Sequence, residues 1–177
     1  MDACILLQIA FFCVSPYNKA VQIFMTGDEL MIPKVIHYCW FGGKPLPELA
    51  QKCIASWKKF CPDYELVRWD ESNFDVKCCD YVREAYEARK WAFVSDYARL
   101  KALVDNGGVY MDTDMEVLRP LDAFMDKLAF AGLESETTIS CGIMACEKGF
   151  APFAEILADY YDRHFVLTGG LDLTPIP

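Results

Sequence analysis

The sequence has 177 residues, the length of one domain with room for a hydrophobic core. Hydrophobic residues make up 54% of the chain and aromatic residues 14%, which excludes a disordered or low-complexity protein. Its 26 acidic residues outnumber 17 basic ones and give a formal net charge of −9, so nucleic acids and anionic membranes are not expected partners.

The chain begins with an apolar stretch that is too short to cross a membrane. The twelve residues from Ala3 to Val14 are almost wholly apolar, but a spanning helix needs about 20. The basic flank of a signal peptide is also absent. We therefore expect no transmembrane helix and a cytoplasmic location, with a weak peripheral anchor at the inner face of the membrane as the alternative. Nine cysteines without a CxxC pair favour reduced thiols over a disulfide framework.

The pattern of a folded domain begins at Met31. Residues 1–30 are therefore interpreted as an N-terminal extension, and residues 31–177 as one domain. Residues 169–177 are rich in Gly and Pro and contain no closing helix or strand. We expect the domain to be C-terminally incomplete for this reason.

Strand and helix patterns alternate along this domain. The β-branched and aromatic run from Val35 to Trp40 predicts a buried strand that Gly42-Gly43 closes. Pro47 opens a helix that runs to Phe60, with apolar residues every three or four positions. Further strands are expected over Tyr64 to Trp69, Val109 to Leu118, Leu128 to Leu133 and Ile139 to Cys146, and further helices over Cys79 to Arg89, Trp91 to Val104 and from Pro152.

This alternation predicts an α/β fold with a single, mainly parallel sheet and helices on both faces. The segment Asn106-Gly107-Gly108 is expected to end the helix from Trp91, because a left-handed residue is needed at the helix C-terminus and glycine tolerates that conformation. In such folds the ligand lies beyond the carboxyl ends of the strands. The loops after Trp40 and around Asp112 are therefore the predicted binding region.

The most informative segment runs from Gly107 to Asp114 and reads Gly-Gly-Val-Tyr-Met-Asp-Thr-Asp. Residues i and i+2 of a strand face the same side, so Asp112 and Asp114 are expected to present two carboxylates side by side. Such a pair repels itself unless a cation compensates, and hard oxygen ligands suit Mn²⁺ or Mg²⁺. The alternative is that the strand ends here with both side chains in solvent.

Two further positions support a binding site. Asp96 and Arg99 are three residues apart on a predicted helix and share one face, although an isolated pair of this kind is usually only a weak ion pair. Trp40 ends a strand beside two glycines, where an aromatic ring could receive a nucleotide base; a buried core Trp is the alternative. The two histidines, His37 and His164, are interpreted as structural residues.

In this order, the three blocks resemble those of one protein family. The residues that carry the likeness are Ile32 to Gly43, Ser95 to Arg99 and Gly107 to Asp114. From about Ile32 to Tyr160 the chain is similar to the glycosyltransferases with an Asp-x-Asp sugar-binding region (family 32). This group includes yeast α-1,6-mannosyltransferases, bacterial capsular-polysaccharide transferases, which are the nearest match, and clostridial glucosylating toxins.

The resemblance implies a nucleotide-sugar-binding fold of the GT-A type and a metal-dependent, retaining transfer of a sugar, in capsular or surface polysaccharide synthesis. The donor would be a nucleotide sugar, with a UDP-sugar as first choice and GDP-mannose as second. The acceptor would be a saccharide or a lipid-linked saccharide.

The resemblance also implies roles for individual residues. Asp112 and Asp114 would hold Mn²⁺ or Mg²⁺ and, with Arg99, act in catalysis. The segment from Ser140 to Ala145 would lie near the donor. The implied substrate-binding residues are Trp40, Asp96, Arg99, Gly108 and Tyr110.

Two other functions compete with this one. Phosphatases with an aspartyl nucleophile also use Asp-x-Asp, but their pair normally follows the first strand and precedes Thr or Val, whereas Glu116 follows here. A truncated domain that binds a nucleotide sugar without turnover is the non-catalytic alternative.

Overall fold

The structure is a computed structural model that describes residues 8–10, 31–133 and 139–173. In chain order the elements are β1 (Gln8–Ala10), β2 (Val35–Cys39), α1 (Glu48–Phe60), β3 (Glu65–Trp69), α2 (Asp80–Glu87), α3 (Trp91–Asn106), β4 (Gly108–Met111), the 3₁₀ turn η1 (Asp122–Phe124), β5 (Ala129–Leu133), β6 (Ile139–Cys146), α4 (Ala151–Asp159), β7 (Val166–Leu167) and β8 (Gly170–Leu171). Among the helices within these ranges, none is both long and apolar enough to cross a membrane.

One six-stranded sheet organises the described part of the chain, in the order β1-β5-β6-β4-β2-β3. Strands β3, β2 and β4 are parallel, because helical crossovers connect them. Strands β6, β5 and β1 continue the sheet with antiparallel pairings, and only residues 134–138 separate β5 from β6. The α/β class and single sheet are as expected, with the parallel pairing confined to the half that carries β2, β3 and β4.

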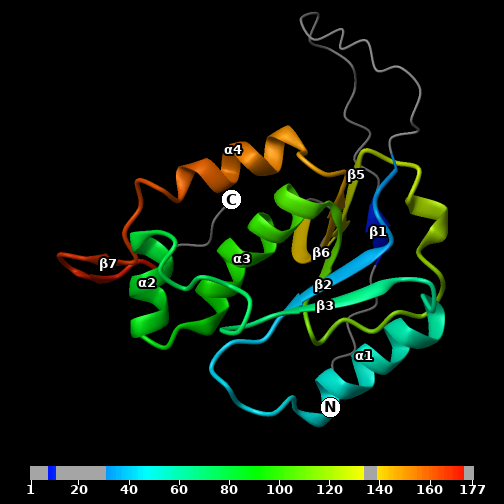
Figure 1. Ribbon diagram of the computed structural model, residues 1–177, viewed down its shortest axis with the longest axis horizontal. Helices are drawn as coiled ribbons and strands as arrows, with labels where there is room; N and C mark the ends of the chain where they lie inside the picture. Colours follow the sequence, from blue (N-terminus) through cyan, green and yellow to red (C-terminus); the bar gives the residue numbers. More distant parts are fainter. Residues whose placement is uncertain (1–7, 11–30, 134–138, 174–177) are drawn as a thin grey trace, which may run out of the picture.

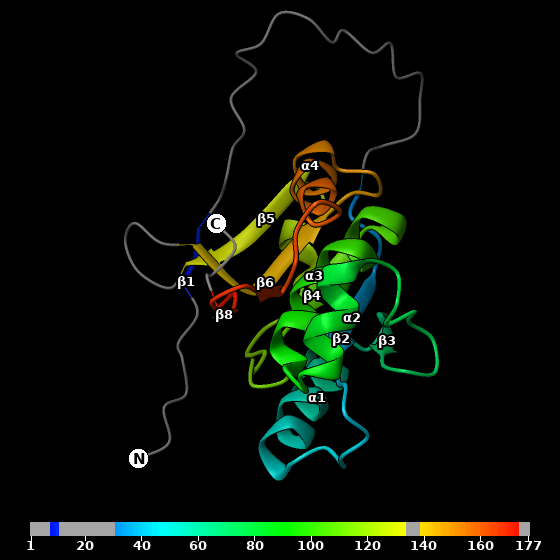
Figure 2. The same cartoon turned by 90° about the vertical axis from the view of Figure 1, so that its left-hand side faces the viewer.

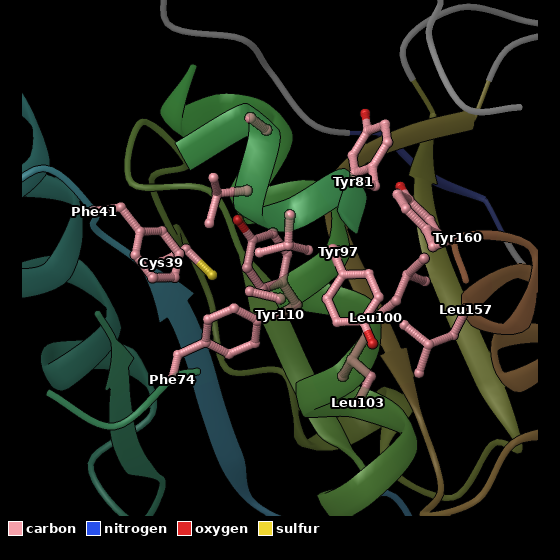
Figure 3. Packing of buried hydrophobic residues seen from close by; sticks show 14 of the residues in the cluster. Cys39, Phe41, Phe74, Tyr81, Tyr97, Leu100, Leu103, Tyr110, Leu157 and Tyr160 are labelled. Carbon is pink, nitrogen blue, oxygen red and sulfur yellow. The ribbon is translucent and has the colours of Figure 1, made fainter. Parts of the chain in front are cut away.

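Helices cover both faces of the sheet, as predicted. Figure 1 and Figure 2 show α1 on one side and α2, α3 and α4 on the other. Each face has its own core, and β4 contributes to both because all four of its residues are buried. Val109 and Met111 face the α1 side, whereas Tyr110 faces α3. Figure 3 shows Tyr110 among the aromatic side chains of this second core.

The end of α3 confirms the prediction that glycine terminates this helix. The helix ends at Asn106, and Gly107 follows with φ of +69°. A Cβ at Gly107 would lie 2.7 Å from the backbone nitrogen of Lys148, so neither conformation nor space permits a side chain. The return into β4 is therefore fixed at the residue that precedes the strand.

His37 is a structural residue, as interpreted from the sequence. It is 2% exposed, and its Nε2 lies 2.9 Å from the Gly107 carbonyl oxygen. The indole N–H of Trp69 donates to its Nδ1 at 3.1 Å, which assigns the proton to Nε2. Burial lowers the pKa of His37, and the Gly107 hydrogen bond only partly opposes this. A neutral imidazole therefore ties β2 to β3 and to the start of β4.

Three segments differ from the sequence-based expectation. The strand predicted over Val109 to Leu118 ends at Met111. Within the N-terminal extension, β1 forms an antiparallel edge strand on β5, and the rest of residues 1–30 lies outside the described residues. Strands β7 and β8 form a small hairpin that the sequence did not predict.

Candidate functional site

A pocket of about 440 Å³ opens at the carboxyl ends of β2 and β4, as sheet topology predicts. Its walls come from three places: the end of β2 with the loop after it, the first turns of α3, and the end of β4 with the turn after it. The lining residues are Cys39, Trp40, Phe41, Lys44, Trp91, Ala92, Ser95, Arg99, Tyr110, Asp112, Thr113 and Asp114. Five of the predicted site residues are among them.

Arg99 is the centre of the polar contacts in this pocket. Its Nη2 lies 2.5 Å from Oδ1 of Asp96 and 3.8 Å from Oδ1 of Asp112. Its Nη1 donates to the carbonyl oxygen of Cys141 at 2.8 Å, and its guanidinium lies 4.9 Å from the ring centre of Tyr110. The Arg99 side chain is only 10% exposed, so one buried cation joins α3, β4 and β6.

Burial and charge act in opposite directions on these groups. Burial raises the pKa of Asp96, and Asp112 adds to this effect while Arg99 opposes it. Burial alone would lower the pKa of Arg99, whereas the carboxylates of Asp112 and Asp96 raise it, and the net direction is upward. Arg99 is therefore a permanent cation, and the pair with Asp96 is far from the exposed ion pair of an ordinary helix surface.

Tyr110 lies beneath the pocket and orients the first acid of the motif. Its ring is 1% exposed, and its hydroxyl donates to Oδ1 of Asp112 at 2.7 Å. Burial raises the pKa of Tyr110 well above its usual value, so the hydroxyl keeps its proton. Hydrogen bonding thus fixes one oxygen of Asp112, and the second oxygen is available to a ligand.

Asp112 and Asp114 lie in a turn, which corrects the expectation that they share the face of a strand. The backbone N–H of Met115 donates to the Asp112 carbonyl at 3.1 Å, and this bond closes the turn. Asp112 is partly buried and Asp114 is exposed, yet both line the same pocket. The two carboxylates therefore face the same pocket although the strand ends before them.

The loop after β2 brings two tryptophans to the pocket. The indole N–H of Trp40 donates to the Lys44 carbonyl at 2.7 Å, which fixes the ring on its own loop. Gly42, with φ of +90°, packs so closely that a Cβ there would lie 2.6 Å from the indole nitrogen of Trp91. Trp40 and Trp91 thus line the pocket from the loop and from α3.

Two predicted residues lie outside the lining of the pocket. Asp96 reaches it only through Arg99. Gly108 lies at the other end of β4, where its φ is +102° and a Cβ would lie 2.7 Å from the Val35 carbonyl oxygen. Close packing of β4 on β2 therefore requires a glycine at this position.

The segment expected near the donor does reach the site, through its backbone. The Cys141 carbonyl accepts from Arg99, and the Gly142 carbonyl accepts the Asp112 N–H at 2.8 Å. The pairing of β5 with β6 shifts register between Ala131 and Gly132, next to these two residues. Such an irregularity re-aims backbone groups, here toward the pocket.

The acids of this pocket fit a hard divalent cation. The described residues contain no group of three or more His, Cys, Asp and Glu that could enclose a metal ion. Two carboxylates, Asp112 and Asp114, are nevertheless what Mg²⁺-type ions take from a protein when phosphate oxygens and water complete the shell. The donor set fits a metal bound together with a phosphorylated ligand.

Lys44 and Trp91 are pocket residues that the sequence reasoning missed. Lys44 lies in a loop without a pattern that would predict its direction. A signal for Trp91 did exist, since Trp91, Ser95 and Arg99 follow at steps of four and share one helical face. A stripe of this kind ahead of the Asp96 and Arg99 pair predicts that Trp91 joins the same surface.

Comparisons with known proteins match this description. Residues 47–131 match the family described as "Glycosyltransferase sugar-binding region containing DXD motif". The chain is 31% identical, over 75% of its length and 37% of the relative, to "Inositol phosphoceramide mannosyltransferase 3" of Schizosaccharomyces pombe. It is 25% identical, over 88% of its length and 29% of the relative, to "Subversion of eukaryotic traffic protein A" of Legionella pneumophila.

Among solved structures, the chain is similar to "PaToxG Glycosyltransferase", with a TM-score of 0.59 and 19% identity over 76% of this chain and 63% of that one. The fold is therefore the GT-A type that the resemblance implied, and the resemblance to the Asp-x-Asp family is confirmed. The chain spans about a third of the length of the curated relatives it matches.

Proposed function

Because residues 47–131 carry the sugar-binding region of the Asp-x-Asp glycosyltransferases, we propose that this chain binds a nucleotide sugar and a divalent metal for glycosyl transfer. The observation that carries the proposal is the common pocket of Asp112, Asp114, Arg99 and Trp40. These residues come from three separate blocks of the sequence. Acids for a metal, a cation and an aromatic ring match the phosphates and the base of a nucleoside diphosphate.

The pocket residues divide the work of binding. Asp112 and Asp114 would hold Mn²⁺ or Mg²⁺, which when bound offsets the charge of the nucleoside diphosphate leaving group. Arg99 contacts Asp96 and Asp112 and, with its side chain 10% exposed, would present only an edge to the phosphates. Trp40 would receive the base on its ring, with Trp91 as a second aromatic wall. Tyr110 lies beneath the pocket and holds Asp112 through its hydroxyl group.

The finer assignments extend the same proposal. A UDP-sugar is our first choice of donor and GDP-mannose the second; two relatives named as mannosyltransferases support including the mannose donor. We assign a retaining outcome and a saccharide or lipid-linked saccharide acceptor, and we place the reaction in surface polysaccharide synthesis in the cytoplasm. These choices rest on the family resemblance.

The test is metal-dependent hydrolysis of nucleotide sugars by the purified full chain. A panel of UDP-sugars and GDP-mannose is incubated with and without Mn²⁺, and release of the nucleotide is measured. Asp114→Asn should lower the rate at least about a hundredfold, because the metal loses one of its two carboxylates. The matched control is Asp159→Asn, an exposed acid on α4 outside the pocket lining.

The outcomes separate the three candidate functions. Hydrolysis that Mn²⁺ stimulates and Asp114→Asn removes supports the transferase. Nucleotide-sugar binding without turnover supports the non-catalytic binding domain. A trapped phosphoenzyme on Asp112 would instead support the phosphatase with an aspartyl nucleophile.

A further inference from the structure

The segment that follows the Asp-x-Asp turn hydrogen-bonds to a helix instead of a neighbouring strand. The indole N–H of Trp57, in α1, donates to the Met115 carbonyl at 2.7 Å. The backbone N–H of Val117 donates to the hydroxyl oxygen of Ser56 at 2.9 Å. Ser56 in turn donates to the Cys53 carbonyl at 2.6 Å, which fixes its rotamer. Two side chains of α1 therefore hold the chain one and three residues beyond Asp114.

All of these contacts are buried. Trp57 is fully buried, and Ser56, Met115 and Val117 are each 9% exposed or less. Hydrogen bonds in such surroundings are costly to lose, because water cannot replace the missing partner. The attachment of this segment to α1 is therefore stiff.

Strand β6 holds the turn from the opposite side. The Gly142 carbonyl accepts the Asp112 N–H at 2.8 Å. A Cβ at Gly142 would overlap the terminal methyl of Met115 and would lie 3.4 Å from Oδ2 of Asp112. The turn is thus enclosed between α1 and β6, with Met115 packed between them.

We propose that Trp57 and Ser56 are positioning residues for the two metal-binding carboxylates, which they fix through the backbone of Met115 and Val117. The inference rests on the proposed function and deepens it. Neighbouring carboxylates repel each other, so a turn that is free to move would separate them before a metal arrives. Attachment to α1 keeps Asp112 and Asp114 directed into one pocket. The entropy cost of ordering the turn therefore falls on folding and not on metal binding.

The test compares three variants of the full chain. Trp57→Phe removes the indole N–H and keeps an aromatic ring, and Ser56→Ala removes only the hydroxyl. The matched control is Trp69→Phe, which removes another indole hydrogen bond, the part-buried one to His37, outside the lining of the pocket. If Trp57→Phe does not fold, Ser56→Ala alone decides the question.

Two readouts are needed, and the first requires no metal. Hydrogen exchange of the peptide that spans residues 112–117 should be at least about fivefold faster in Trp57→Phe and Ser56→Ala than in Trp69→Phe. The dissociation constant for Mn²⁺ in the presence of UDP should rise by a similar factor in the same two variants. A purely structural role would lower stability without this selective change.

Each result is decisive. Exchange and Mn²⁺ affinity equal to those of Trp69→Phe would overturn the positioning role, even if Trp57→Phe is less stable. Faster exchange together with weaker Mn²⁺ binding supports it. If the unchanged chain binds no Mn²⁺, the proposed function fails and with it the positioning of metal ligands, whereas a failure confined to the variants leaves the proposed function standing.

Discussion

The hydroxyl of Tyr110 donates a 2.7 Å hydrogen bond to Asp112, which lies two residues later in the chain. Tyr110 is the third residue of β4, and Asp112 directly follows the strand. The buried ring thus sets the direction of the first acid at the point where the sheet ends. This contact makes the tyrosine of the motif part of the acid site.

Removal of that hydroxyl should weaken metal binding. In Tyr110→Phe, we expect metal-dependent donor hydrolysis to fall by about tenfold, because Asp112 loses a hydrogen bond to its charged form. The effect should be partly overcome by a higher Mn²⁺ concentration. Hydrolysis rates across a Mn²⁺ titration provide the measurement. An unchanged Mn²⁺ dependence would mean that the contact does not orient the acid.

Arg99 should not tolerate lysine. Arg99→Lys keeps the charge, but an ammonium cannot contact Asp96, Asp112 and the Cys141 carbonyl with the same geometry. We expect the free energy of unfolding to fall by about 2 kcal/mol. Donor hydrolysis should fall by roughly tenfold or more. Urea denaturation and initial rates measure the two effects.

Arg83→Lys is the matched control for this substitution. Arg83, whose side chain is 36% exposed, makes ion pairs with Asp80, Glu84 and Glu87 at the edge of α2. Such contacts contribute little to stability, so hydrolysis should be unchanged. Equal losses in Arg83→Lys and Arg99→Lys would contradict the central position of Arg99.

Nucleotide binding should be visible in tryptophan fluorescence. The pocket contains Trp40 and Trp91, whereas Trp57 and Trp69 lie outside its lining. UDP or GDP should therefore quench the emission of the unchanged chain. Trp40→Phe should remove most of this quenching and Trp91→Phe part of it, while Trp69→Phe should retain it. Full quenching in Trp40→Phe would show that the base does not stack there.

His37 should make stability depend on pH. Its pKa is lowered in the folded chain, so below about pH 6.5 the unfolded chain binds a proton before the folded chain does. The contribution of His37 to the free energy of unfolding should be fully present above this pH. It should fall as the pH decreases, by at most about 1.4 kcal/mol per pH unit. Urea unfolding between pH 8 and 5, at about half-unit steps, checks this expectation. His37→Gln should abolish this slope.

His164 changes stability with pH in the opposite direction to His37, so its contribution has to be removed from the comparison. The adjacent Glu84 carboxylate raises the pKa of His164, so its contribution is present at low pH and is lost as the pH rises through that raised value. The comparison is therefore made in chains that carry His164→Gln. A slope that persists after both substitutions would assign the pH dependence to other groups.

Local sequence patterns predicted much of this fold. The start of α1 after Pro47 and the end of α3 before Gly107 follow from properties of single residues, a ring without an N–H and a tolerance for positive φ. The strand from Val35 was predicted from a run of β-branched and aromatic residues. Each of these signals lies within the element it defines or at the residue that borders it.

The segment after Met111 could not be predicted from such local signals. Met115 and Val117 alternate with polar residues as in a strand, and both are buried. Their backbone hydrogen bonds go to Trp57 and Ser56 on α1 instead of a neighbouring strand. That choice depends on a helix about 60 residues earlier in the chain, as the separations of 58 and 61 residues show.

The candidate site likewise combines features that local sequence patterns predicted with contacts that depend on distant segments. The pattern around Asp112 and Asp114 indicated the acids, and helical spacing paired Asp96 with Arg99. The hydrogen bonds from Arg99 to Cys141 and from Asp112 to Gly142 arise from packing of β6 against β4, which the sequence of either strand does not specify. Lys44 reaches the pocket through a loop whose course depends on Trp91 and Gly42.

Manganese binding tests the central role of Asp112 and Asp114 most directly. The free Mn²⁺ concentration is followed by electron paramagnetic resonance as the full chain is added, with and without UDP, and the same titration is made with the double variant Asp112→Asn and Asp114→Asn. We expect the unchanged chain to bind Mn²⁺ more tightly when UDP is present and the double variant to bind none. Equal Mn²⁺ binding by both chains would contradict the assignment of these two carboxylates as the metal ligands.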